Sequence, residues 1–122
     1  MPFLEVAIFD QHRTARPALS QRLTDAVAQA FGIERDIISI YFTVLAVEDY
    51  AHAGVHAPGP SDQRIFIRLH AFRRDVAQRR EAASALTNAI ASTLGVGPKD
   101  IVVYFLDRGP DEVAHAGALA SD

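Results

Sequence analysis

Cysteine is absent from this chain of 122 residues. Its absence excludes a disulfide framework, a thiolate metal site and a thiol nucleophile, and it suits a reducing cytoplasm. The chain also has no excess of basic residues, since it contains 12 Lys and Arg residues and 15 Asp and Glu residues. Neither nucleic acid nor an anionic membrane is therefore an expected partner. The sequence also lacks a secretory leader and an apolar run of ~18 residues, so we expect a cytoplasmic protein that spans no membrane.

The most informative feature is an internal repeat. A shift of 63 positions aligns residues 2–42 with residues 65–105 without a gap, and it pairs Gly32 with Gly95, Tyr41 with Tyr104 and Phe42 with Phe105. This period is longer than that of a solenoid and occurs only twice, so it indicates duplication of one small unit. We predict a single domain, 1–122, made of two fused repeats at about 2–48 and 64–108, joined by a turn-rich connector.

Each repeat has the pattern strand, helix, strand. Residues 2–9 and 64–72 alternate as strands do, and Leu19, Leu23 and Val27 recur at helical spacing, as do Val76, Leu86 and Ile90 further along. Two such units predict an α+β fold, with tandem β-α-β units that form a four-stranded sheet and two helices on one face. Both sheet faces are largely apolar in the sequence. Two helices cover only one of them, so we expect an oligomer.

Three features of the sequence coincide: Pro2 directly behind Met1, the tandem β-α-β unit, and the segment "IFIRLHAFRRDVAQRR", in which an arginine ends the third strand just before a helix. Together they resemble the tautomerase superfamily. The resemblance covers nearly the whole chain and extends to the fused, trimeric members, such as 5-carboxymethyl-2-hydroxymuconate isomerase, malonate semialdehyde decarboxylase and cis-3-chloroacrylic acid dehalogenase. It implies a tautomerase/MIF-like fold, a homotrimer, a small carboxylate substrate and no cofactor or metal.

The resemblance also implies the site residues. In this superfamily the methionine is removed and the amino-terminal proline, here Pro2, is the catalytic amine. Arg74 matches the arginine at the end of the third strand and would bind the substrate carboxylate. Tyr104 matches a functional tyrosine of the dehalogenase, whereas His115 stands where that enzyme has a catalytic glutamate and Val27 where it has a histidine. These two differences argue against dehalogenation.

The decarboxylase offers a second comparison. It pairs its proline with an aspartate before the second strand and with two arginines at the end of the third, and Asp36, Arg73 and Arg74 are the corresponding candidates here. The family separates those arginines by one residue, but in this chain they are adjacent, so their side chains should diverge. Three functions stay open: a tautomerase, a decarboxylase or hydratase of a 3-oxo acid, and a non-catalytic oligomeric scaffold that retains the fold.

A proline nitrogen at a chain terminus is a secondary amine, and model α-amino groups titrate near ~7.7 to 8. Apolar surroundings or a nearby arginine would lower that pKa toward the value that suits a general base. We therefore expect Pro2 to move a proton during keto-enol tautomerisation of a small 2-oxo or 2-hydroxy-dienoic acid. Arg68 and His70 share one face of the third strand and line either the site or a subunit interface.

Overall fold

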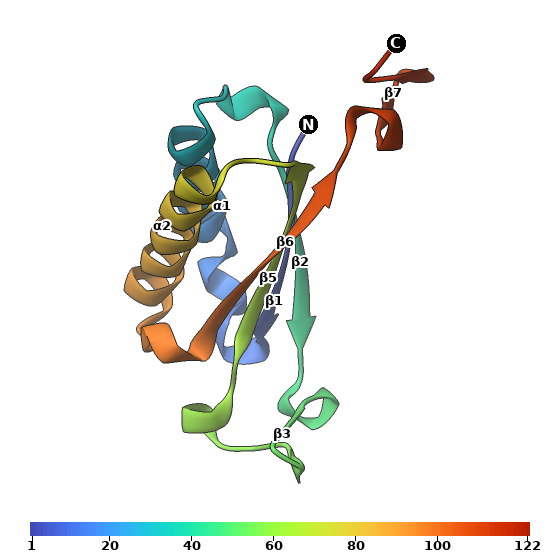
Figure 1. Ribbon diagram of the computed structural model, residues 1–122. Coiled ribbons are helices and arrows are strands. Elements are labelled where there is room, and N and C mark those ends of the chain that lie inside the picture. Colours follow the sequence, from blue (N-terminus) through green and yellow to red (C-terminus); the bar gives the residue numbers. More distant parts are fainter.

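The computed structural model describes residues 1–122 and has two layers, a four-stranded sheet and a pair of helices that cover one of its faces (Figure 1). The strands are β1 (Phe3–Phe9), β2 (Ser39–Leu45), β5 (Ile65–Phe72) and β6 (Ile101–Arg108), in the spatial order β2-β1-β5-β6. β1 and β2 are parallel, as are β5 and β6, and β1 and β5 pair antiparallel at the centre. This is the predicted α+β arrangement.

The two helices are α1 (Arg16–Phe31) and α2 (Val76–Leu94), and they end in the same way. Gly32 and Gly95 follow them with φ angles of 64° and 70°, the left-handed conformation that glycine adopts at little cost. Asp75 caps the start of α2 by accepting a hydrogen bond from the Gln78 backbone N–H at 2.8 Å. Neither helix combines the length and apolar character needed to cross a membrane.

The core lies between the helices and the inner face of the sheet. Its fully buried side chains alternate along the strands, as Leu4, Val6 and Ile8 do on β1, and recur at helical spacing on α1 and α2. On α2 the buried stripe begins at Ala82, whereas Val76, which the sequence pattern placed on it, is 58% exposed. The first turn of α2 extends past the edge of the core and contributes little to it.

Two short hairpins follow the two repeats. One consists of β3 (Ala51–His52) and β4 (Val55–His56), and the other of β7 (Ala114–His115) and β8 (Ala118–Leu119). Both carry the sequence AHAG, and the alanine and glycine at each tip have positive φ angles, between 51° and 83°. The two hairpins are thus related by the same shift of 63 residues as the two repeats. The repeat therefore extends to the end of the second hairpin, beyond Phe42 and Phe105, where the sequence alignment ended.

Short 3-10 helices connect these elements, at Asp10–Ala15, Arg35–Ile37, Val47–Asp49, Pro60–Asp62, Pro98–Asp100 and Pro110–Glu112. The last of them begins a C-terminal arm, residues 109–122, which carries β7 and β8 and projects away from the sheet (Figure 1). The Glu112 carboxylate accepts a hydrogen bond from the Gly109 backbone N–H at 2.9 Å, which fixes the turn where the arm leaves β6.

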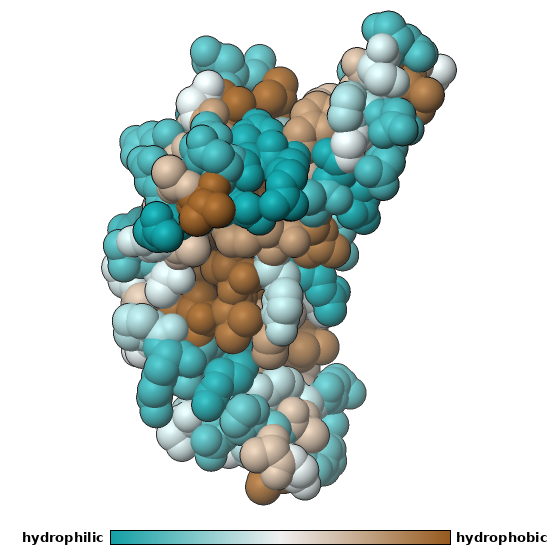
Figure 2. Space-filling model, viewed as in Figure 1, coloured by the Kyte–Doolittle hydropathy of each residue, from teal (hydrophilic) through white to brown (hydrophobic).

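The sheet face opposite the helices is uncovered. Tyr41 and Tyr104 occupy corresponding places on the two outer strands and are 65% and 55% exposed. Phe66 and Leu106 line a shallow hollow on this face together with Arg68 and Tyr104. Figure 2 views the molecule from the β6 edge of the sheet and shows hydrophobic surface across the middle, where β6 passes, between more hydrophilic ends. Such an exposed mixture of apolar and polar groups is typical of a surface that contacts other subunits.

Candidate active site

A cavity of about 470 Å³ lies where the start of β1 meets the end of β5 and the base of the C-terminal arm. Its lining residues are Met1, Phe3, His70, Ala71, Phe72, Arg108, Glu112, Val113, Ala114 and His115. The antiparallel register brings these segments together, since Phe3 lies directly opposite His70, and the parallel register places Arg108 beside Phe72. One end of the sheet therefore gathers chain segments that are far apart in sequence.

Pro2 is buried at this end of the sheet, between two residues that line the cavity, Met1 and Phe3. Its carbonyl oxygen accepts a hydrogen bond from the Ser39 backbone N–H at 3.3 Å, which anchors the start of β1 to the start of β2. Met1 itself is 54% exposed. Removal of this methionine would leave the proline nitrogen as a terminal amine next to the cavity.

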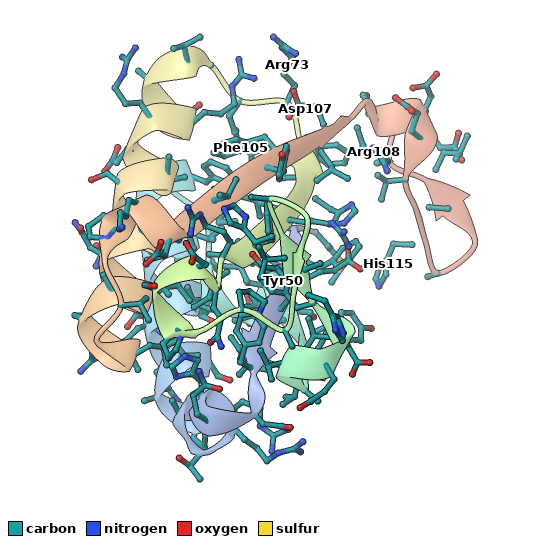
Figure 3. All side chains as sticks on the ribbon, turned by 90° about the horizontal axis from the view of Figure 1, so that it is seen from below. Tyr50, Arg73, Phe105, Asp107, Arg108 and His115 are labelled. Carbon is teal, nitrogen blue, oxygen red and sulfur yellow. The ribbon has the colours of Figure 1, made fainter.

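The cavity combines apolar walls with basic side chains. The basic residues of its lining are Arg108, His70 and His115. Its one acidic residue is Glu112, whose carboxylate already accepts a hydrogen bond from the Gly109 backbone N–H. Arg108 donates one hydrogen bond, to the Asp107 carbonyl oxygen at 3.1 Å, and its remaining guanidinium N–H groups have no partner in the structure. Figure 3 shows Arg108 and His115 on the side of the C-terminal arm. Such a site can hold a carboxylate.

The arginines predicted at the end of the third strand have other contacts. Arg74 donates to the Phe72 carbonyl oxygen at 2.9 Å, and its guanidinium lies 4.6 Å from the centre of the Phe31 ring. Arg73 is largely exposed and pairs with Asp107 at 3.1 Å, away from Arg108 in Figure 3. The two neighbouring side chains thus diverge, as predicted. Arg74 follows the cavity wall at Phe72 without lining the cavity itself.

The other predicted residues are divided between the cavity and its surroundings. His115 lines the cavity from the tip of the arm. Asp36 is exposed and lies in the short helix before β2, at the sheet end where Ser39 meets Pro2. Tyr104 lies on the open sheet face, in the separate hollow with Arg68. Arg108 was missed by the sequence reasoning.

The corresponding position in the other half of the molecule is filled. A shift of 63 residues relates Val113 and Phe72 to Tyr50 and Phe9. The Tyr50 ring packs edge-on against Phe9 with 5.1 Å between ring centres, and its hydroxyl accepts a hydrogen bond from the Arg64 backbone N–H at 3.0 Å. At the corresponding place beside Pro2, the smaller Val113 lines the open cavity.

This difference makes a direct prediction. Val113→Tyr should fill the cavity with a ring packed against Phe72 and abolish the binding of small carboxylates, with little loss of stability. Tyr50→Val should leave ligand binding unchanged but lower the free energy of unfolding by about 2 to 3 kcal/mol, because the contact of a half-buried ring with Phe9 and a hydrogen bond are lost. Calorimetric ligand titration and urea unfolding of both variants measure the two effects. Undiminished binding by Val113→Tyr would show that ligands bind elsewhere.

Comparison with solved structures identifies the fold. A fused 4-oxalocrotonate tautomerase, solved as a symmetric trimer, matches with a TM-score of 0.88 and 25% identity over 98% of this chain and 96% of that one. The chain has the tautomerase-superfamily fold. Malonate semialdehyde decarboxylase, described with decarboxylase and hydratase activities, matches at a TM-score of 0.78 and 16% identity over 98% of this chain and 94% of that one. Both proteins are of the tautomerase superfamily, which the sequence resembles.

A third tautomerase-superfamily structure, Pt0534 inactivated by 2-oxo-3-pentynoate, matches with a TM-score of 0.87 and 20% identity, covering 98% of this chain and 96% of that one. Neither a family model nor a curated protein sequence matches the chain. The likeness to these proteins is therefore one of fold, and it extends over nearly the whole chain.

Proposed function

We propose that the protein is a tautomerase-superfamily enzyme in which Pro2, after removal of Met1, is the general base for keto-enol tautomerisation of a small 2-oxo or 2-hydroxy-dienoic acid. The observation that carries the proposal is the cavity itself. Its lining includes the residues on both sides of a buried Pro2, together with an arginine that has unused donors.

The reaction uses groups from three parts of the chain. The Pro2 amine takes a proton from the carbon beside the carbonyl and returns it at the other end of the conjugated system. Arg108 holds the substrate carboxylate, and a charged hydrogen bond of this kind also stabilises an enolate as it forms. Arg74, just behind the cavity wall, adds positive charge. The apolar walls at Phe3 and Phe72 keep water away from the amine.

The proposed enzyme is a homotrimer in the cytoplasm. The open sheet face, with Tyr41 and Tyr104 more than half exposed, supports assembly through that face. The fused 4-oxalocrotonate tautomerase that this chain resembles was solved as a trimer. In the trimer Tyr104 would be presented to an adjoining subunit, where its hydroxyl can donate a hydrogen bond.

Two assays separate the proposed activity from its main alternative. Purified protein should accelerate the ketonisation of 2-hydroxymuconate or of phenylpyruvate enol, followed by ultraviolet absorbance. Release of carbon dioxide from malonate semialdehyde without enol turnover would instead favour a decarboxylase. That outcome would give a role to Asp36 and Arg73, which in this structure lie outside the cavity. Absence of both activities would support a non-catalytic scaffold.

A further inference from the structure

Glu5 and His70 form a hydrogen-bonded pair on the open sheet face. His70 Nε2 lies 2.6 Å from the Glu5 carboxylate, which as an ionised acid only accepts, so Nε2 carries the proton. The imidazole stacks on the Phe3 ring with 4.2 Å between centres and 4° between planes, and its side chain is 15% exposed. One ring nitrogen is thus bound to a carboxylate and the ring plane is fixed, while Nδ1 makes no hydrogen bond.

This pair occurs once in a molecule built from two repeats. The positions related to Glu5 and His70 by the 63-residue shift are Arg68 and Ala7, which cannot form it. His70 lines the cavity beside Met1 and Phe3, whereas Ala7 lies at the opposite end of the sheet, toward the hairpin that contains Tyr50. The Glu5–His70 pair and the open cavity therefore lie at the same end of the sheet, and neither has a counterpart in the other repeat.

We propose that His70 is a catalytic proton donor that acts with Pro2, a role that rests on the proposed function. The Pro2 nitrogen receives the proton that leaves the substrate carbon, and the C–H electron pair moves into the enolate. Nδ1–H of the His70 imidazolium then gives its proton to the enolate oxygen, which yields the enol, a prolinium and a neutral imidazole. The reverse direction returns both protons, and exchange with water resets the two groups.

Glu5 is the positioning residue in this scheme. Its carboxylate bonds Nε2, which leaves Nδ1 as the ring nitrogen that can meet the substrate. Other charged or titratable groups also face the pair. Arg68 lies opposite Glu5 on β5 and Tyr41 opposite it on β2, and Arg108, Glu112 and His115 share the cavity with His70. Among these groups only the Glu5 carboxylate is hydrogen-bonded to the imidazole, so it is the group that positions the ring.

The test is the pH dependence of kcat/KM for phenylpyruvate tautomerisation. The wild-type profile should be bell-shaped, with one limb for Pro2 and one for His70. His70→Gln should lose the alkaline limb and lower kcat about 100-fold, with KM changed less than threefold. Glu5→Gln should move the alkaline limb to lower pH, because the variant removes the negative charge beside the imidazole. His56→Gln is the matched control, since this exposed histidine of the β3–β4 hairpin lies outside the cavity lining and its ring is hydrogen-bonded to the Glu48 carbonyl oxygen.

The outcomes are distinguishable. If Pro2→Ala loses activity about 100-fold while His70→Gln keeps the bell-shaped profile and a kcat within twofold of the wild type, the role of His70 is overturned and the proposed function stands. If the wild type has no turnover, both are overturned. Should His70→Gln fail to fold, Glu5→Gln decides, because an unmoved alkaline limb in that variant contradicts the proposal.

Discussion

Blocking the Pro2 nitrogen should lower tautomerase turnover by at least 10³-fold. A short amino-terminal tag joins further residues to Pro2 by a peptide bond. The Pro2 nitrogen is then an amide, which is not basic. Met1 already lines the cavity, so any residue retained there also occupies the space beside the proposed base. Pro2→Ala keeps a terminal amine but loses the ring, and we expect an activity about 100-fold below that of the wild type. Stopped-flow absorbance of enol ketonisation measures both.

The matched control carries the same tag at the C-terminus. It leaves the Pro2 nitrogen untouched, and Ser121 and Asp122 are exposed and outside the cavity lining. Its turnover should equal that of the untagged protein. Equal activity of the two tagged forms would contradict a role for the amine, because only one of them retains it.

The second large effect concerns the carboxylate-binding arginine. Arg108→Ala should raise KM for 2-oxo acids about 10- to 100-fold with a smaller change in kcat, since it removes a charged hydrogen bond made in both the ground state and the transition state. Arg108→Lys should recover part of the loss, because lysine keeps the charge but not the two-pronged geometry. Steady-state kinetics and titration with a non-reacting carboxylate measure the change.

Arg74→Ala tests the other cation. The Arg74 guanidinium is bonded to the Phe72 carbonyl and stacked on Phe31, so we expect a loss of about tenfold in kcat/KM. Arg80→Ala, an exposed arginine of α2, is the control for the loss of one positive charge and should behave as the wild type. If KM is unchanged in Arg108→Ala but strongly increased in Arg74→Ala, then Arg74 and not Arg108 binds the substrate carboxylate.

The fold could be predicted because the two repeats carry the same information. The strand alternation and helical spacing recur at a constant offset, and the glycines that end the helices, Gly32 and Gly95, occupy matching positions. A weak pattern in one copy is thus supported by the other. The main-chain geometry of those glycines explains why they coincide, since both lie in the left-handed region that follows a helix.

The cavity was harder to predict, because it depends on where the repeats differ. Leu45 in the first copy corresponds to Arg108 in the second, Ala7 to His70, and Tyr50 to Val113. The offset of 63 continues through both hairpins, and following it past Phe105 would have exposed the exchange of tyrosine for valine. Which end of the sheet carries the cavity follows from side-chain packing at Tyr50, and this packing is not visible in hydrophobic periodicity.

The most direct test of the account is to locate the site of modification by 2-oxo-3-pentynoate, the compound that inactivated the similar protein Pt0534. A terminal amine adds to its electron-poor triple bond without loss of atoms, so the adduct mass equals that of the chain without Met1 plus the whole reagent. We predict one adduct per chain, on the peptide that begins with Pro2, and loss of activity in step with labelling. An intact mass that retains Met1, or an adduct at another residue with Pro2 unmodified, would contradict the account.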